Sequence, residues 1–354
     1  MWPYFVLLLI ICVCAFIDNG ARDKLTQRRI KKTSIRKFVH ILLAVFSGFR
    51  YKVGVDYDNY ITIFNGDIGY SVNEPGFEFL INFLTKIGAT PQMMFFIMAV
   101  VTQYFVYQTF KNINKGFWLS TIVYYCFSTF YIASFNGSRQ YVAIAIAIWA
   151  LKFVYERKYI QYFTSVIIAA LCFHFTVLIF IPVYFYLLQD YSRKSIIIQI
   201  VAVIFGARFL NIIVSYTPYL VYLERERDMP INDTVYLFTI VSFTLAFLSH
   251  KYELLKNDRV LINMNLLCLF SLILVLVQTS GMLIQMLLRI NSYFLFAYLC
   301  ILPKVVYSTR PQIRKIVQTL LIIAAFAYLV KTIVFGGVHY SLVPYQMNFE
   351  LFKI

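Results

Sequence analysis

The apolar run VLINMNLLCLFSLILVLVQTS, from Val260 to Ser280, decides the fold class. It contains no charged residue, and its length is close to the roughly 20 residues with which a helix crosses the core of a bilayer. A backbone in lipid must satisfy its own hydrogen bonds, so a continuous run of this kind forms a helix. A transmembrane barrel would instead show short segments of alternating hydrophobicity.

Similar runs recur along the whole chain, of which 61% is hydrophobic and only 14% charged, with a mean hydropathy of +0.73. A soluble domain has about a quarter of its residues charged. We therefore predict an all-α polytopic integral membrane protein with a single transmembrane domain over residues 1–354 and about twelve membrane-spanning helices. The spans are expected near residues 3–17, 37–50, 91–110, 117–135, 139–155, 159–174, 176–189, 196–215, 233–250, 260–280, 281–303 and 316–335.

Basic residues gather in alternate connections, and this pattern predicts the orientation. The basic connections are 18–37, 111–115, 152–158, 190–194, 251–259 and 304–315, and the whole formal net charge of +16 belongs to their face. The positive-inside rule assigns that face to the cytoplasm. Residues 18–37 then form a basic cytoplasmic loop, and both chain termini lie outside. Residues 50–90 form an external loop in which 75–88 is a half-span or an interfacial helix, and 216–232 form a second external loop.

The composition also excludes some classes of ligand. The basic excess is a topology signal without an interleaved aromatic platform, so no nucleic-acid partner is predicted. The six cysteines all lie in apolar runs without metal-ligand spacing, which is typical of small buried hydrophobic residues. No metal and no cofactor are predicted.

Two polar stretches of the first external loop carry candidate functional groups: FRYKVGVDYDNY from Phe49 to Tyr60, and EPGFE from Glu74 to Glu78. A charge at the edge of a span is costly and by default suggests function. Arg50 is therefore a candidate ligand-binding group, and Asp56 a general base or the partner of an arginine. The alternative is a solvated loop with an arginine anchor. Glu74 is either a functional carboxylate or an acid that stabilises the positive end of a helix.

Three further groups lie at or inside later spans. Arg139 follows Ser138, a good N-cap, and a cation at a helix N-terminus is misplaced unless an anion is present. That anion is a phosphate-like ligand or a loop carboxylate. His174 ends a span and is either functional or an interface residue. Arg289 lies inside a span, roughly 12 Å from its outer end, and needs a carboxylate or a ligand phosphate. Gln285 shares its helical face, and Arg208 is a weaker candidate of the same kind.

At these residues the sequence resembles the EpsG family of Wzy-type polysaccharide polymerases. The motifs that carry the resemblance are Arg50 to Tyr60, Glu74-Pro75-Gly76-Phe77, Ser138-Arg139-Gln140, His174-Phe175-Thr176, and Arg289 with Tyr293-Phe294. The resemblance implies a glycosyltransferase of GT-C-like architecture in the bacterial inner (plasma) membrane, with no metal requirement. Its substrates would be oligosaccharides linked to undecaprenyl diphosphate, its product O-antigen of lipopolysaccharide, capsule or exopolysaccharide, and a chain-length regulator would be a partner.

The same resemblance assigns roles to the candidate residues. Arg50, Arg139 and Arg289 would bind the substrate diphosphate, and Asp56, Glu74 and His174 are the catalytic candidates. Secondary candidates are Tyr57, Tyr60, Gln140, Arg208 and Gln285. Two alternatives remain open: a transporter that flips lipid-linked oligosaccharides, and a membrane acyltransferase that modifies sugars.

Overall fold

A computed structural model describes residues 1–24, 32–66, 74–113, 116–190, 192–216, 233–252, 255, 258–278 and 281–352. The chain divides into two compact units, each of which is described by itself. Unit 1 comprises Met1–Phe153, Ile160–Leu178 and Arg310–Ile354, and unit 2 comprises Val154–Tyr159 and Ile179–Thr309. Among the described residues, the elements are helices apart from one antiparallel pair of two-residue strands.

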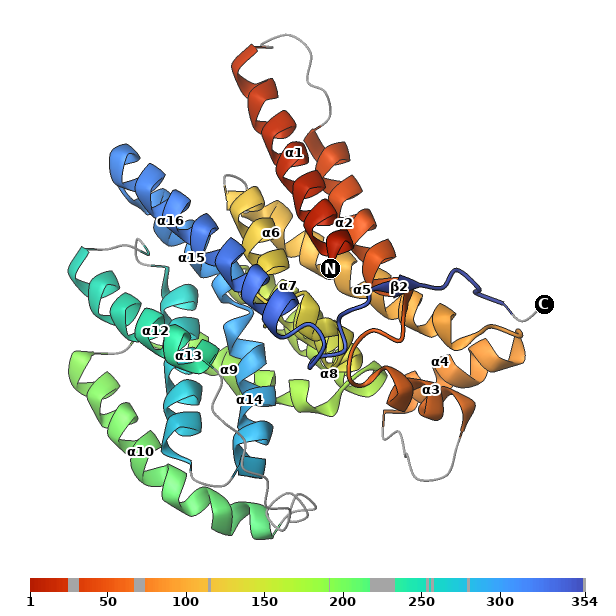
Figure 1. Cartoon of the computed structure of the whole chain (residues 1–354). Coiled ribbons are helices and arrows are strands. Elements are labelled where there is room, and N and C mark those ends of the chain that lie inside the picture. Colours follow the sequence, from red (N-terminus) through yellow and green to blue (C-terminus); the bar gives the residue numbers. More distant parts are fainter. Residues whose placement is uncertain are drawn as a thin grey trace. The chain divides into compact units, whose positions relative to one another are not determined.

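Most elements of unit 1 precede the main part of unit 2 in the chain, and the last three follow it (Figure 1). The elements that lie wholly or mainly in unit 1 are α1 (Trp2–Lys24), α2 (Lys32–Gly48), β1 (Arg50–Tyr51), α3 (Tyr57–Asn65), α4 (Pro75–Lys86), α5 (Pro91–Asn112), α6 (Phe117–Cys126), η2 (Ile132–Phe135), α7 (Ser138–Tyr155), α8 (Tyr159–Cys172), η3 (Phe175–Ile179), α16 (Pro311–Val330), η5 (Lys331–Phe335) and β2 (Gln346–Met347).

The prediction of a helical membrane protein is confirmed. Within the described residues, four helices are long and apolar enough to span a bilayer, and a bent pair with an angle of 44° makes a fifth span if counted as one. The four are Trp2–Asn19, Pro91–Asn112, Arg259–Val277 and Pro311–Phe335, and the bent pair is Ile284–Leu295 with Tyr298–Ser308. The larger number of spans and the GT-C-like arrangement stay predictions.

Three expected boundaries are wrong. The span 117–135 is not continuous, because α6 ends where Phe127 adopts an extended conformation. The span 281–303 is bent by 44° between α14 and α15, and α15 itself contains Pro303, which removes one backbone donor inside that helix. The basic loop is shorter than 18–37, because α1 continues to Lys24 and α2 begins at Lys32.

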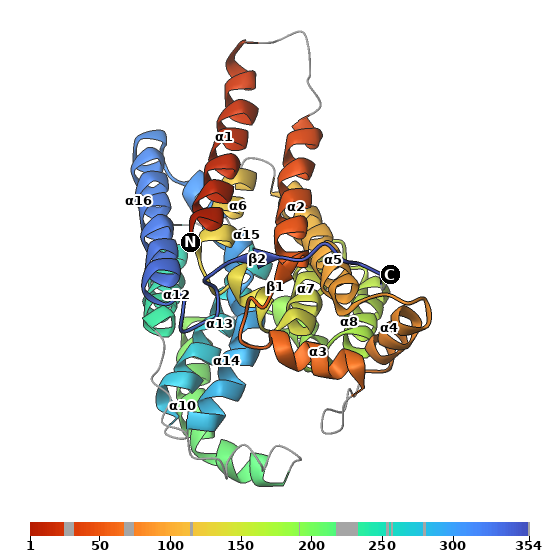
Figure 2. The same ribbon diagram turned by 45° about the vertical axis from the view of Figure 1, so that its right-hand side comes forward.

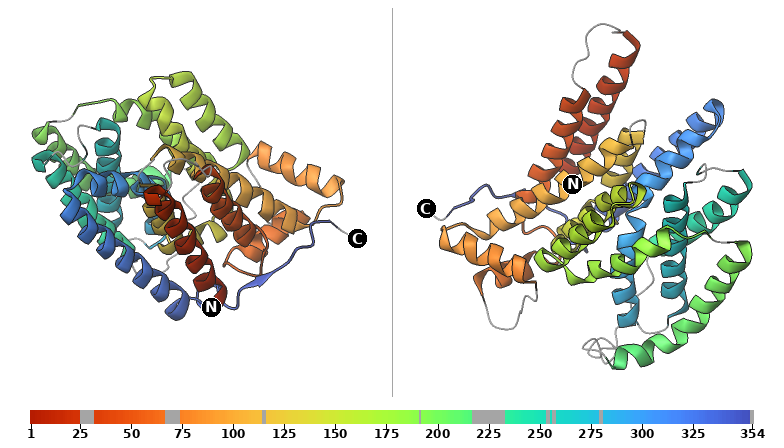
Figure 3. Two further views of the ribbon diagram at one scale, coloured as in Figure 1. Left: turned by 90° about the horizontal axis from the view of Figure 1, so that it is seen from above. Right: turned by 180° about the vertical axis from the view of Figure 1, so that it is seen from behind.

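A buried carboxylate joins three helices of unit 1 near that basic loop. Asp18 on α1 is only 2% exposed. It accepts hydrogen bonds from Arg36 Nη2 on α2 at 2.9 Å and from Trp118 Nε1 on α6 at 2.8 Å. Figure 3 shows α1 and α2 side by side in both of its views. The charge at this end of α1 therefore serves the packing of the helices.

The C-terminal segment runs across the end of unit 1 that carries the 50–54 loop, the start of the predicted external loop (Figure 2). β2 pairs antiparallel with β1, with Arg50 opposite Met347. Gly54 N donates to the carbonyl of Ser341 at 2.9 Å, and the N-terminal Tyr4 hydroxyl donates to the carbonyl of Leu342 at 2.9 Å. The two terminal segments and the 50–54 loop thus share one end of unit 1. Which side of the membrane this end faces stays a prediction.

Unit 2 is built around one long apolar helix. Its elements are α9 (Phe180–Leu187), α10 (Arg193–Ser215), α12 (Asp233–Tyr252), α13 (Arg259–Val277), α14 (Gly281–Leu295) and α15 (Tyr298–Ser308). α13 packs against the other five elements. Polar side chains in this core bond to one another: the Tyr298 hydroxyl lies between Asn265 Oδ1 and Ser242 Oγ, each at 2.5 Å. Bonds of this kind hold helices together where no water is present.

Candidate active site

Glu74 lies at the centre of a charged cluster in unit 1. Its side chain is 7% exposed, and its Oε2 accepts a hydrogen bond from Arg139 Nη1 at 2.7 Å. Its Oε1 accepts a long bond from Phe175 N at 3.4 Å and lies 3.7 Å from His174 Nδ1. Three residues predicted from separate motifs therefore meet: Glu74 from α4, Arg139 from α7, and His174 from the turn after α8.

Glu74 makes no side-chain hydrogen bond to the start of its own helix. It occupies the N-cap position of α4, with φ −93° and ψ 109°, but its side chain makes no capping hydrogen bond. Pro75 follows at the first helical position, where its missing N–H is harmless. The extended backbone at Glu74 and the start of α4 leave the carboxylate to residues of other helices.

Gly76 allows α4 to approach α8. A Cβ on Gly76 would lie 2.7 Å from both Cα and Sγ of Cys172, the last residue of α8. The chain then turns, since the N–H groups of Phe173 and His174 both donate to the carbonyl of Ala169. The absence of a side chain at Gly76 thus brings the start of α4 against the turn that carries His174.

Arg139 uses one edge of its guanidinium for Glu74. Its Nε atom is buried and has no hydrogen-bond partner among the residues that the structure describes. The guanidinium carbon lies 5.1 Å from the centroid of the Phe77 ring and 6.0 Å from that of Tyr60. Arg139 N donates to the Tyr60 hydroxyl at 3.1 Å. The anion at this helix start is therefore a loop carboxylate, while Nε remains directed at no described acceptor.

Arg50 lies in a different environment from the one predicted. It is 1% exposed, and it donates to the carbonyls of Ser47 at 2.7 Å, Phe135 at 3.0 Å and Val53 at 3.3 Å, and to Ser138 Oγ at 2.9 Å. Arginine keeps its charge in proteins. Arg50 forms no ion pair with a described residue. Its donors hold backbone segments together, so little of the group remains for a diphosphate.

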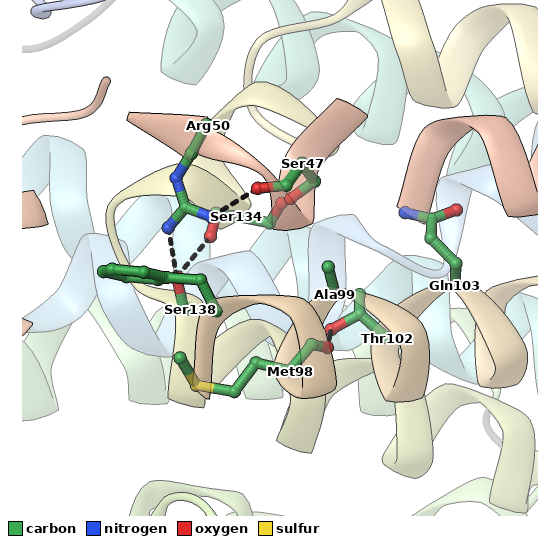
Figure 4. Close-up of a pocket in the computed structure, with 9 residues that line it drawn as sticks. Ser47, Arg50, Met98, Ala99, Thr102, Gln103, Ser134 and Ser138 are labelled. Atoms are coloured by element: carbon green, nitrogen blue, oxygen red, sulfur yellow. Dashed lines mark hydrogen bonds between the residues drawn. The ribbon is translucent and has the colours of Figure 1, made fainter. Parts of the chain in front are cut away.

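The hydroxyl of Ser138 takes part in the same network, and its predicted N-cap role is wrong. Ser138 is the first residue of α7, and its Oγ donates to the carbonyl of Ser134 at 2.9 Å while it accepts from Arg50. Figure 4 shows these bonds beside a small pocket between Arg50 and Gln103. The pocket has a volume of about 10 Å³, close to the smallest space that holds one water molecule.

The other candidate residues of the 50–60 stretch either pack in the core or contact the charged cluster. Tyr57 is buried and stacks on Phe95 with ring centroids 4.9 Å apart, and burial raises its pKa to about 12. Asp56 is half-buried at the N-cap of α3 without capping it, and Asn59 Nδ2 donates to its Oδ1 at 3.5 Å. Tyr60, one turn further, is the member that reaches Arg139. Gln140 is buried on α7, 6% exposed.

Two supporting residues were missed from the sequence. Asn136 Oδ1 accepts from Val55 N at 2.7 Å, and a Cβ on Gly54 (φ 99°) would lie 2.8 Å from the same oxygen. Gln92 Nε2 donates to the carbonyl of Gly48 at 2.6 Å and to that of Arg50 at 3.2 Å. In the sequence, Asn136 and Gln92 are uncharged amides beside apolar runs, and only charged residues stand out clearly in such a chain.

The candidates of unit 2 are less informative. Arg289 is exposed on α14, which corrects its predicted burial, and its carbonyl accepts from Ser292 Oγ at 2.6 Å. Gln285 is half-buried one turn earlier. Arg208 lies in α10, and its side chain is outside the described part of the chain. Of the predicted loop 216–232, residues 217–232 also lie outside it.

Comparison with known proteins gives one result. The model of the EpsG family matches residues 35–347, nearly the whole chain. This range includes the first external loop, the Arg139 and His174 motifs and Arg289. No curated protein and no solved structure matches the chain.

Proposed function

The chain belongs to the EpsG family, whose members are Wzy-type polymerase-like, and on this premise we propose that it is a polysaccharide polymerase. Family membership indicates a membrane polysaccharide polymerase-like function. The proposed reaction transfers a growing glycan from undecaprenyl diphosphate to the sugar of an incoming lipid-linked repeat unit, at the outer face of the bacterial plasma membrane. The proposed architecture is GT-C-like, with about twelve spans.

The observation that carries the proposal is the cluster of Glu74, Arg139 and His174. Its members come from three motifs and meet within 4 Å of one carboxylate. Charged groups brought together in this way in an apolar chain mark a functional site. Among the described residues, the cluster joins an anion-binding group to a group that can take up a proton.

Arg139 is proposed to hold the donor diphosphate. Glu74 fixes the guanidinium through Nη1, which leaves the edge formed by Nε and Nη2 for a ligand. Two parallel N–H groups match two phosphate oxygens. As the glycosidic C–O bond to the diphosphate breaks, negative charge gathers on the leaving phosphate, and a fixed cation stabilises it more than it stabilises the bound substrate.

His174 is proposed to accept the proton of the attacking sugar hydroxyl. The Glu74 carboxylate is engaged by Arg139, but it also lies 3.7 Å from His174 Nδ1 and can stabilise the imidazolium. Thr176 Oγ1, 3.3 Å from the same nitrogen, restricts the orientation of the ring. The acceptor oxygen forms the new C–O bond, its proton passes to His174, and undecaprenyl diphosphate leaves. Asp56, half-buried and one turn from Tyr60, is the alternative base.

Product analysis tests the proposal. Purified full-length protein is incubated with lipid-linked repeat units, and the products are separated on a gel. A ladder of longer glycans is expected. Acylated units would identify an acyltransferase instead, and unchanged units moved across a vesicle membrane would identify a flippase.

A matched pair of variants links the product to the cluster. Glu74→Gln should abolish the ladder, because it removes the charge that orients Arg139. Glu78→Gln, one turn along the same helix and exposed, should leave the ladder intact. A full ladder from Glu74→Gln would contradict the role of the cluster, although not the polymerase activity itself.

A further inference from the structure

A lateral groove lies between α2 and α5 in unit 1. Its volume is about 360 Å³, which falls within the range of about 300–1,000 Å³ that is typical of ligand sites. Ala44 and Val45 on α2 and Phe96 and Val100 on α5 form apolar parts of its walls. Val100 is 41% exposed, and the groove opens on the surface of a helix that is long and apolar enough to span the bilayer. Lipid is therefore the solvent that meets it.

The length of the groove corresponds to one leaflet. On α2 it extends from Lys37 to Val45, and on α5 from Phe96 to Gln108. At 1.5 Å per residue these stretches are about 12 and 18 Å long. The hydrocarbon core of a bilayer is about 30 Å thick, so each leaflet contributes about half of that. A single hydrocarbon chain of one leaflet would fill the groove lengthwise.

Two polar residues of the walls, His40 and Gln103, are held in place by hydrogen bonds. His40 Nδ1 lies 3.1 Å from Gln103 Oε1, and Gln103 Nε2 donates to the Tyr124 hydroxyl at 2.7 Å. Near the other end, a Cβ on Gly48 would lie 2.9 Å from Phe96 Cα, so the two helices are in close contact there. A ligand would enter a fixed groove and would not have to order it.

Positive charge marks one end of the groove. Lys37 lines the groove, and Lys111 follows Gln108 by three residues on the same face of α5. Both lysines are exposed, and neither forms an ion pair with a described residue. Their neighbour Arg36 is already paired with Asp18. The two ammonium groups can therefore bind an anion that does not belong to the protein. They lie on the face that the charge pattern assigns to the cytoplasm.

We propose that this groove binds an anionic glycerophospholipid, with one acyl chain between α2 and α5 and its phosphate at Lys37 and Lys111. A cytoplasmic leaflet contains anionic lipids that attract basic side chains at its surface. The bound chain covers apolar wall residues of α2 and α5, and so stabilises the pair of helices from which the Arg50 segment continues. The proposal concerns a structural lipid and is independent of the polymerase reaction.

Native mass spectrometry of the full-length protein tests the proposal. The protein is purified from nanodiscs that contain equal amounts of phosphatidylglycerol and phosphatidylcholine, and the retained lipid is identified. Wild-type protein should retain phosphatidylglycerol preferentially. The double variant Lys37→Ala/Lys111→Ala should lose about 30-fold of this preference, or about fivefold for each lysine. Lys315→Ala, an exposed lysine of α16, is the matched control and should not change it.

A second pair of variants tests the groove itself. Val100→Trp should reduce all retained lipid by at least about tenfold, because the larger ring fills the space of the chain. Val334→Trp is the control, since Val334 is 42% exposed and lies outside the groove. Unchanged retention in both the double-lysine variant and Val100→Trp would overturn the proposal, and so would equal retention of the two lipids by wild type. Displacement by an isoprenyl phosphate but not by phosphatidylglycerol would also overturn it. Should Val100→Trp fail to fold, the exposed lysine pair still decides.

Discussion

Arg50 and Arg139 belong to the same unit and were predicted to do the same work, yet their surroundings differ. Arg50 is buried and gives four hydrogen bonds, three to backbone carbonyls and one to Ser138. Arg139 is 20% exposed in its side chain, bonds one carboxylate and has a buried Nε without a described acceptor. Carbonyls and a hydroxyl cannot be displaced by a ligand without breaking the fold. The two arginines therefore differ in their partners: those of Arg50 belong to the fold, whereas Arg139 keeps a buried donor without a described acceptor.

The largest expected effect is the loss of polymer formation when Arg139 is replaced. Arg139→Ala should reduce polymer formation by at least about 10²–10³-fold, the usual loss when one group that stabilises a developing negative charge is removed. Arg139→Lys should recover only part of the rate, because lysine keeps the charge and lacks the planar fork. The gel ladder measures the rate, and membrane abundance is the control. Full-length glycan from Arg139→Ala would remove Arg139 from the site.

On the Arg50 side, the expected effect is on folding. Arg50→Ala leaves buried carbonyls without donors, and each such group costs about 1–3 kcal/mol, so the loss of stability should be about 3 kcal/mol or more. Thermal unfolding in detergent and the amount of protein in the membrane measure it. A stable Arg50→Ala protein that makes no polymer would indicate that Arg50 binds the substrate, as Arg139 is proposed to do.

Gly76→Ala tests how Glu74, the carboxylate that binds Arg139, is positioned. The added methyl group would meet the backbone of Cys172 at 2.7 Å, and α4 would shift away from the turn with His174. A displacement of about 1 Å can cost about 10²-fold in rate. The matched control is Gly206→Ala, where a Cβ meets nothing within 4 Å. Equal activity of the two variants would show that close packing of α4 on α8 does not control the cluster.

The smallest expected effect compares two tyrosines of one helix. Tyr60→Phe removes the hydroxyl that accepts from Arg139 N, and a hydrogen bond of this kind contributes about 1 kcal/mol, or about fivefold in rate. The Tyr57 hydroxyl donates a long 3.5 Å bond to Gln92 Oε1 and does not contact Arg139, so Tyr57→Phe should be close to neutral. Initial rates of glycan extension measure both. The reverse order of effects would place Tyr57, and with it the Arg50 region, closer to the substrate.

Much of the candidate site was predictable, because charge is rare in an apolar chain. Glu74, Arg139 and His174 stand out for that reason, and the structure brings them together. Their pairing was not predictable, since it depends on the contact of Gly76 with Cys172 between helices distant in sequence. Arg50 was misjudged for a related reason: the sequence displays its charge, but not the carbonyl of Phe135 that it meets.

The fold shows the same division between local and distant information. The apolar runs locate the helices, because their length and composition are local properties. The end of α6 at Phe127 falls inside a run that carries no charge, with only Ser128 and Thr129 beyond it as a weak sign of a break. The pairing of β1 with β2 rests on a register between distant segments that have no alternating pattern of their own.

The C-terminal segment has a consequence for biosynthesis. β2 is translated after the described helices of both units. Its segment nevertheless bonds to early parts of the chain: Met347 pairs with Arg50, Ser341 accepts from Gly54 N, and Leu351 accepts from Thr90 N at the start of α5. While the nascent chain is still on the ribosome, the early helices can enter the membrane, but the loop beside the charged cluster lacks its last strand. The 50–54 loop is therefore completed only when β2 has been made, and a chain truncated within α16 would be an inserted protein whose loop lacks its partner strand.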